Sequence, residues 1–250
     1  MASNLFRQTT LQPVQAAGWR SGLANLWRKE SQHWQQTWLW QAVIWASLLS
    51  GFTAIAGFAS HRPALPASPA SPGILMLMFL FFILFTSFGT VIMVHSKLLD
   101  EQQSGTMAWI LSKPVTRAAF LLSKFAALPG MLLTMTVIPG VIAYPIIWLF
   151  TGQMPSPLTF LLILVFNAST ITFFYCLTLL LGVLLKKRVG ILALGLFLCF
   201  VLMQALFNNN ANALLLIAHV LWLQLAAAAL LTIALLCFLL ALWRFTRQEF

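Results

Sequence analysis

Acidic residues are scarce in this sequence: among 250 residues there are four Asp and Glu against fourteen Lys and Arg. Charged residues make up only 7% of the chain and hydrophobic residues 61%, whereas soluble domains carry roughly a quarter of charged residues. This shortage of charge excludes an ordinary soluble domain and predicts an all-α protein with several membrane spans. In such a protein the net charge of +10 indicates orientation in the membrane, and we expect no binding to nucleic acid.

The sequence also lacks the motifs of several enzyme classes. It contains no G-x-x-x-x-G-K-[ST] phosphate loop and no Gly-Lys pair, so we do not expect this chain to bind ATP as P-loop proteins do. Neither a nucleophile elbow nor a pair of carboxylates is visible, and we therefore assign no catalytic residue. If ATP drives the protein, another subunit must bind it.

Few residues offer metal-ligand chemistry. The three cysteines lie in apolar runs, which favours small core residues over a disulfide or a metal site; they are Cys176, Cys199 and Cys237. The four histidines show no ligand spacing, so no metal site is expected; His219 suits a structural role or a contact with substrate. Met131 and Met135, one helical turn apart, suit either packing or a soft metal such as Cu(I).

The chain divides into a polar tail over residues 1–18, an interfacial helix over 19–37, six spans within 38–243 and a second tail over 244–250. In the interfacial segment, apolar residues recur at spacings of three, four and seven, which is typical of an amphipathic helix at the membrane surface. Its tryptophans suit headgroup depth, and its charged residues would be costly to bury. The residues singled out in this helix are Trp27, Arg28, Lys29 and Glu30.

The spans are separated by polar, proline-rich or cationic stretches, and none of them contains Asp, Glu, Lys or Arg. This absence argues against a proton- or sodium-driven carrier. A run of 31 uncharged residues, 213–243, would extend about 46 Å as one helix, so we divide it into a short re-entrant or interfacial piece and a last span. The predicted spans are 38–59, 74–95, 125–150, 158–185, 189–207 and 221–243.

Several features inside the spans allow two interpretations. Small residues at 46, 50 and 54 form a stripe that suits packing within the chain or a dimer face. Pro139 and Pro145 in the third span suit a gate or cavity lining, or are tolerated kinks. Asn167 and Thr170 in the fourth span face a translocation path or join helices by hydrogen bonds.

The stretch 99–124 is the longest segment of the sequence that could not lie in the hydrocarbon core of a membrane, because it carries two acidic and three basic residues. Gly105 permits a turn, the next residues predict a short apolar helix centred on Trp109, and Pro114 ends or restarts that helix. From spacing alone, this is either an ordinary polar loop or a surface helix that another protein grips.

The same stretch resembles the cytoplasmic segment of the ABC transporter type 2 permease family. The resemblance rests on the order of acidic residues, Gly-Thr, an apolar run, Ser-x-Pro-Val-x-Arg and a Lys, here Lys124. It implies a single permease domain over residues 1–250, with an elbow helix before the first span, a cytoplasmic coupling helix between spans 2 and 3 that docks on an ATP-binding subunit, and an outer re-entrant segment before span 6. The residues that it assigns to coupling are Glu101, Gly105, Thr106, Trp109, Pro114 and Arg117.

Orientation follows from the positive charges. Thirteen of the fourteen Lys and Arg lie on one side of the membrane, and Arg62 on the other, if four segments share that side. These are the N-terminus, the stretch 99–124, the Lys-Lys-Arg run 186–188 and the C-terminus. By the positive-inside rule that side is the cytoplasm. We therefore expect both termini in the cytoplasm; the family resemblance further implies a bacterial protein whose spans lie in the inner membrane.

Together these observations predict the permease subunit of an ATP-driven ABC exporter. Its partners would be membrane lipid, a separate ABC ATP-binding subunit that holds ATP and Mg, and a second permease subunit, identical or related; this chain itself would hold no cofactor. Two alternatives are a non-transporting scaffold that anchors a cytoplasmic partner through the same loop, and a channel or carrier that works without an ATPase.

Overall fold

The computed structural model describes residues 23–60, 72–103, 116–151, 156–185, 188–208 and 220–247, and every regular element within these ranges is a helix. This confirms the all-α prediction. The elements are α1 (Leu23–Ser60), α2 (Pro72–Gln103), α4 (Arg117–Phe125), α5 (Leu128–Leu132), the π-helix η1 (Leu133–Val137), α6 (Ile138–Thr151), α7 (Pro157–Leu184), α8 (Arg188–Asn208) and α10 (Val220–Arg247).

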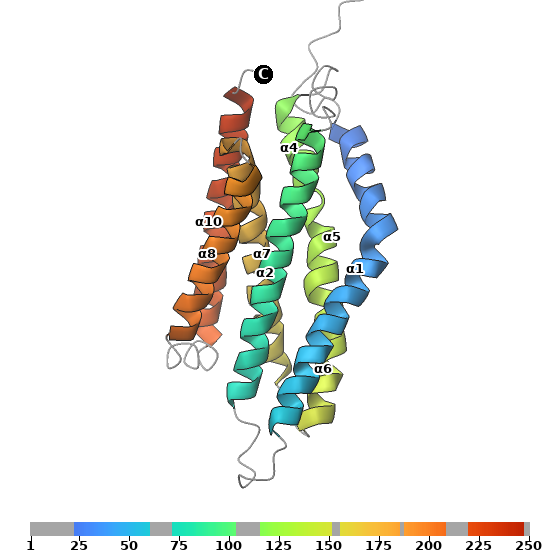
Figure 1. The fold of residues 1–250 in the computed structure, drawn as a ribbon, viewed down its shortest axis with the longest axis vertical. Helices are drawn as coiled ribbons and strands as arrows, with labels where there is room; N and C mark the ends of the chain where they lie inside the picture. Colours follow the sequence, from blue (N-terminus) through green and yellow to red (C-terminus); the bar gives the residue numbers. More distant parts are fainter. Residues whose placement is uncertain are drawn as a thin grey trace, which may run out of the picture.

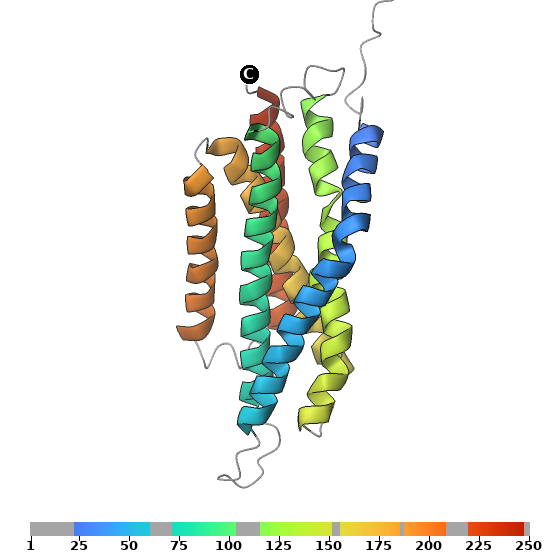
Figure 2. The ribbon, with the colours of Figure 1, turned by 45° about the vertical axis from the view of Figure 1, so that its right-hand side comes forward.

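The helices form an elongated bundle in which successive passages of the chain alternate in direction (Figure 1). α7 packs most extensively against α10 and also against α2, while α1 packs along α6 and contacts α4. α8 packs mainly against α2 and stands at the outside of the bundle (Figure 2). The bundle therefore contains two closely packed groups, one of α1 with α4 to α6 and the other of α2, α7, α8 and α10.

Four of the described helical stretches are long and apolar enough to cross a membrane. They are Leu80–Lys97, Arg117–Leu149, Pro157–Leu184 and Leu221–Arg247, and a shorter apolar helix covers Gly190–Val201. The fourth and fifth predicted spans coincide with α7 and α8 to within a residue at each end. The count of six spans stays a prediction, and the predicted re-entrant piece at 213–219 lies outside the described residues.

α1 is one continuous helix of 38 residues, which corresponds to a length of about 57 Å. The sequence analysis places a boundary between the interfacial helix and the first span after residue 37, but no helix end occurs there in the described part of the chain. The two predicted elements are therefore the two halves of one rod that runs through the whole bundle (Figure 2).

The third span is interrupted several times. Its helix begins at Arg117 and not at Phe125 as predicted, turns at 126–127, and resumes as α5 with Pro129 in its first turn, where a backbone donor is not needed. The π-helix η1 then leads into α6, which contains Pro145. A segment with this many irregularities is held by its neighbours more than by its own backbone hydrogen bonds.

Candidate functional site

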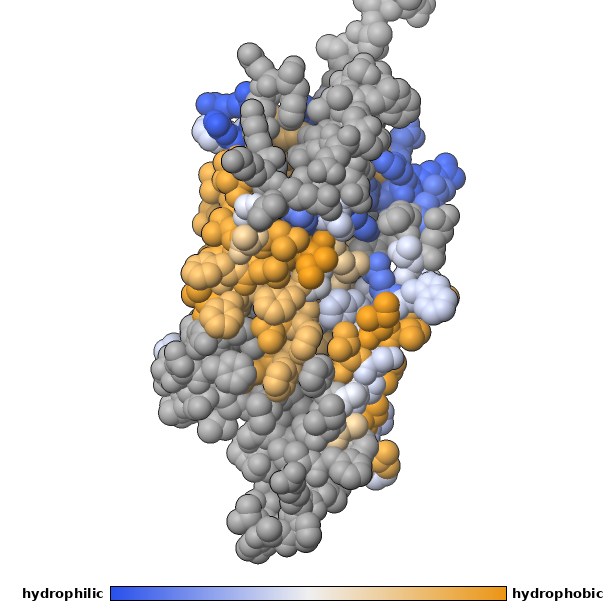
Figure 3. All heavy atoms as spheres, viewed as in Figure 1, coloured by the Kyte–Doolittle hydropathy of each residue, from blue (hydrophilic) through white to orange (hydrophobic). Residues whose placement is uncertain are grey.

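The described charged residues lie toward one end of the bundle, which we call the charged end (top of Figure 1). The start of α1, the end of α2, the start of α4 and the end of α10 meet there (Figure 1). Hydrophilic side chains gather at this end, and a hydrophobic surface covers α8 and α10 below them (Figure 3). This is the distribution expected where a membrane protein emerges from hydrocarbon into water.

α4 is a nine-residue helix that begins directly after the segment 104–115. Thr116 caps its start by accepting a hydrogen bond from the backbone N–H of Ala119 at 3.2 Å. One side of α4 faces α10, where the rings of Phe120 and Phe245 stack with centroids 5.8 Å apart. Arg117 also donates from Nη1 to the carbonyl of Thr246 on α10 at 3.3 Å.

A buried ion pair joins α4 to α1. The ammonium of Lys124 lies 2.5 Å from Oε1 of Glu30, and each residue is only 6% exposed. Lys124 also lies over the ring of Phe120, 5.5 Å from its centroid. A buried pair of this kind is costly to separate, because each charge would then stay in a poorly solvated place without its partner.

This ion pair corrects two expectations from the sequence. Burial of Glu30 was expected to be costly, yet Glu30 is buried, and Lys124 supplies its counter-charge. The third span was predicted to begin at residue 125, after Lys124, so that no span would contain Asp, Glu, Lys or Arg; the apolar helix Arg117–Leu149 begins earlier and includes Lys124. A nearby counter-charge lowers the cost of burial on which both expectations rested.

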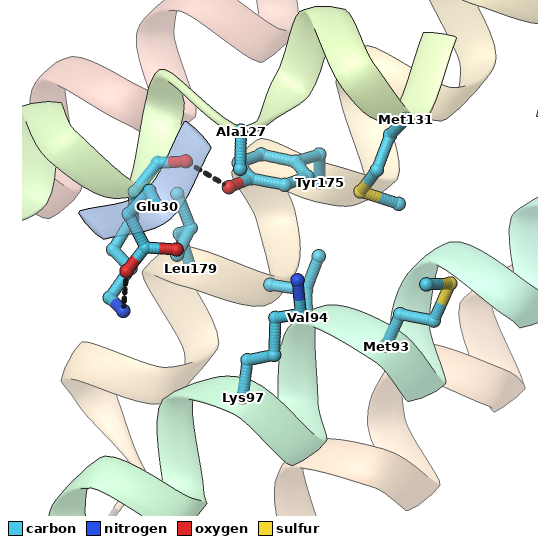
Figure 4. A pocket seen from close by; sticks show the side chains of 9 residues that line it. Glu30, Met93, Val94, Lys97, Ala127, Met131, Tyr175 and Leu179 are labelled. Carbon is cyan, nitrogen blue, oxygen red and sulfur yellow. Dashed lines mark hydrogen bonds and ion pairs between the residues drawn. The ribbon is translucent and has the colours of Figure 1, made fainter. Parts of the chain in front are cut away.

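A third helix is attached at the same residue. The hydroxyl of Tyr175 on α7 donates to the backbone carbonyl of Lys124, which also accepts from the N–H of Ala127 at 3.0 Å. The chain turns here, at residues 126–127 between α4 and α5. Tyr175 therefore satisfies a carbonyl at the break and ties the break to α7 (Figure 4).

A small cavity of about 20 Å³ lies beside this contact (Figure 4). It is large enough for a water molecule and much too small for a transported molecule. We therefore interpret it as a hydrated gap between five helices, α1, α2, α4, α5 and α7, and not as a section of a translocation path. It is lined by Glu30, Met93, Val94, Lys97, Lys124, Ala127, Met131, Tyr175 and Leu179.

The structure places only part of the predicted coupling residues. Arg117 lies at the first position of α4 and is bonded to α10, and Glu101 lies in the last turn of α2. The other four, including the predicted helix around Trp109, are outside the described residues: Gly105, Thr106, Trp109 and Pro114.

The predicted elbow residues separate into two sets. Trp27 is 51% exposed, and Arg28 and Lys29 are also exposed, as the sequence analysis expects of headgroup-facing side chains. Glu30 is the exception because it points into the protein. Sequence reasoning named Glu30 and Lys124 separately but did not pair them, and it did not mention Tyr175.

The polar residues proposed for a translocation path lie deep in the bundle. Asn167 is fully buried; its Nδ2 donates to Thr136 of η1 at 3.0 Å, and its Oδ1 accepts from Thr86 of α2 at 2.8 Å. Thr170 is also buried and donates to its own helix at the carbonyl of Phe166. The contacts of Asn167 therefore join helices within one chain, whereas that of Thr170 stays within α7. A role of these side chains in a path stays a prediction.

The two prolines proposed for the path differ in their environment. Pro139 is buried and Pro145 is exposed on α6. Of the two methionines considered as soft-metal ligands, Met135 accepts a hydrogen bond from Thr90 at 3.7 Å, and Met131 and Met135 belong to the same hydrophobic cluster. Among the described residues there is no group of His, Cys, Asp and Glu suited to a metal ion.

Comparison with known proteins adds a family to this geometry. A family model described as "ABC-2 family transporter protein" matches residues 28–220, which covers more than half of the chain and includes both Glu30 and Lys124. No match was found among curated proteins.

Proposed function

Because the chain belongs to the ABC-2 family of transporter proteins, we propose that it is the permease subunit of an ATP-driven exporter in a bacterial inner membrane. A separate ABC ATP-binding subunit, which holds ATP and Mg, docks on the charged end. A second permease subunit, identical or related, completes the translocation path. The permease assignment rests on the family; the exporter direction rests on the resemblance of the stretch 99–124 to the type 2 permeases.

The observation that best supports coupling is the attachment of α4. This helix follows directly on the segment 104–115, which we propose docks on the ATPase and call the docking segment. α4 contacts α1 through Lys124, α7 through Tyr175 and α10 through Phe120. A displacement of the docking segment therefore reaches three helices through a single short one. If α4 contacted no other helix, a displacement of the docking segment would not be passed to the rest of the bundle.

The docking segment acts in this proposal as follows. Trp109 inserts into a groove of the ATPase, Gly105 and Pro114 shape the ends of the short helix, and Glu101 and Arg117 fix its register by charge. Thr106 belongs to the same contact. When the ATPases close on ATP, the segment moves, α4 follows, and the helices tilt to change the access of the path from one side of the membrane to the other.

Orientation is supported by the same charges. All Lys and Arg residues in the described ranges lie toward the charged end, and the positive-inside rule assigns such an end to the cytoplasm. Both termini are then cytoplasmic, and the ATPase approaches from the side where ATP is available. The exposed tryptophan and cations at the start of α1 contact lipid headgroups at the same level.

Affinity purification of the tagged chain from its native membrane, followed by mass spectrometry and an ATPase assay, tests this function. We expect a stoichiometric partner with a phosphate loop, which is lost or uncoupled in Trp109→Ala. The matched control is Trp148→Ala, because Trp148 is half exposed on α6 far from the charged end. Retention of the partner and of its nucleotide response in Trp109→Ala would count against docking through this segment.

The same purification, together with a flux assay on the purified chain in vesicles, separates the alternatives. A scaffold would bring down a partner whose binding and structure do not respond to nucleotide. A channel would give flux in vesicles that contain this chain alone. Either result would replace the proposal of an ATP-driven permease subunit.

A further inference from the structure

The Glu30–Lys124 contact differs in kind from the other described attachments of α4. We propose that this ion pair stays closed throughout the ATP cycle and makes α1 and α4 a single rigid unit, so that movement of the docking segment displaces α1. Glu30 and Lys124 are thus positioning residues for coupling. This inference rests on the proposed function, since it presumes that an ATPase moves the segment before α4.

The ion pair is buried, and it resists opening more than the contacts of α4 with α10 do. Glu30 and Lys124 are each 6% exposed and their charged atoms are 2.5 Å apart. The contacts of α4 with α10 are of another kind: Arg117 donates to a neutral carbonyl at 3.3 Å in an exposed place, and the stacked rings of Phe120 and Phe245 are apolar. Stacked rings can slide without leaving a charge unpaired, whereas the ion pair cannot open without doing so.

The third span is not one continuous α-helix. The turn at 126–127 interrupts the helix between α4 and α5, and η1 interrupts the regular α-helix again at Leu133–Val137. A push along α4 is therefore poorly transmitted along its own chain. The lateral contact with α1 provides a stiffer connection, because α1 is unbroken from Leu23 to Ser60.

α1 extends from one end of the bundle to the other (Figure 2). α1 starts at the charged end, packs against α4 there, and continues along η1 and α6 to the opposite end of the bundle (Figures 1 and 2). A displacement that enters α1 beside Glu30 is thus delivered to the far side of the membrane. The charged pair connects the ATPase side of the protein to its opposite end through a single helix.

Spin labels on the intact complex with its ATPase, in lipid nanodiscs, test this inference. Cys176, Cys199 and Cys237 are first replaced by Ala. Labels on Asn25→Cys and Ala118→Cys then report the separation of α1 from α4 by dipolar broadening, and labels on Asn25→Cys and Arg244→Cys report that of α1 from α10 by double electron–electron resonance. A non-hydrolysable ATP analogue should leave the first separation unchanged and shift the second.

Three variants examine the ion pair itself. Glu30→Gln should lose the nucleotide-induced shift between α1 and α10, while the ATPase stays bound and continues to hydrolyse ATP. The exchanged double variant Glu30→Lys with Lys124→Glu should restore the shift, a rescue that loss of packing alone does not predict. Where Glu30→Gln fails to assemble, Glu30→Cys with Lys124→Cys, bridged by a short thiol crosslinker, should keep the shift.

Several outcomes would overturn the inference. One is a nucleotide-induced change in the α1–α4 separation, because the pair then opens during the cycle. Others are an undiminished α1–α10 shift in Glu30→Gln and loss of that shift in the crosslinked protein. A complex in which Trp109→Ala leaves all separations and the ATPase unaffected would instead overturn the proposed function, and this inference with it.

Discussion

Trp45 of α1 lies against Gly89 of α2 so closely that a Cβ atom on Gly89 would stand 2.2 Å from the ring carbon Cη2 and 2.3 Å from Cζ2. The methyl carbon of Met135 in η1 would lie 3.5 Å from the same position. Three helical segments thus meet at a residue without a side chain, which is the way in which small residues allow close helix packing in membranes.

Gly89→Ala should destabilise the bundle by about 1–3 kcal/mol, because the indole of Trp45 must move out of a packed place. The matched control is Gly51→Ala, since a Cβ at Gly51 on the exposed face of α1 meets nothing within 4 Å. That variant should be neutral or slightly stabilising, given the helix propensity of Ala. Thermal unfolding of the purified protein in detergent measures both.

A double variant tests whether the clash with the Trp45 indole causes the loss of stability in Gly89→Ala. If the clash with the indole is the cause, Gly89→Ala combined with Trp45→Leu should cost less than the sum of the two single changes. Strict additivity would mean that the ring and the glycine do not interact in the folded protein.

Replacing Asn167 by Asp should destabilise the protein more than replacing it by Ala. Asn167→Ala removes two interhelical hydrogen bonds and leaves a small void, which should destabilise the protein by about 1–2 kcal/mol. The loss is limited because the Thr86 hydroxyl also lies 2.7 Å from the carbonyl of Phe82 and can donate there. Asn167→Asp has the same shape but introduces a carboxyl at mid-depth, where an ionised Asp costs about 2.5–3.5 kcal/mol.

The comparison of these two variants is made by the unfolding midpoint of each at neutral pH. A larger loss for Asn167→Ala than for Asn167→Asp would show that the site is hydrated, as a residue facing an open path would be. That result would favour the path-lining interpretation of Asn167 over its role in joining helices.

The span boundaries could be predicted where prolines or charged residues mark the ends of an apolar run. α7 starts after a proline-rich segment and is followed by Lys186 and Lys187, and the predicted limits agree with the structure. At the start of the third span no such signal exists: residues 117–124 carry Arg117 and Lys124 and therefore look polar. They are helical and packed because α1 and α10 supply the partners for them.

The contact at the centre of the candidate site could not be derived from local pattern. Glu30 and Lys124 are 94 residues apart, so the argument that burial of Glu30 is costly was sound for an isolated helix and failed for the folded chain. A signal for Tyr175 was available, because it is one of only two tyrosines in the sequence and lies within an apolar run. A hydroxyl placed there needs a partner, which turned out to be the carbonyl at the helix break.

Phe120→Ala should be among the most damaging single changes at the charged end. Phe120 is 2% exposed, stacks on Phe245 and lies beneath the Lys124 ammonium, so truncation leaves a cavity at a cost of about 3–5 kcal/mol. Phe197→Ala on α8 is the control, since Phe197 is 60% exposed and should cost far less. Equal losses of thermal stability for the two would contradict the described packing of α4 on α10.

Thiol labelling from each side of the membrane determines the orientation. Asn25→Cys lies at the exposed start of α1 at the charged end. Ser68→Cys falls in the sequence between the end of α1 and the start of α2, two helix ends that lie at the opposite end of the bundle. A membrane-impermeant maleimide should label Asn25→Cys only in inside-out vesicles and Ser68→Cys only in intact cells, because thirteen of the fourteen Lys and Arg favour the cytoplasm for the charged end. The unsubstituted chain reports the background from its own thiols, of which Cys176 and Cys199 are buried.

The reverse pattern would place the charged end outside the cell, away from ATP, and would therefore exclude docking of an ATPase on α4 and its neighbours.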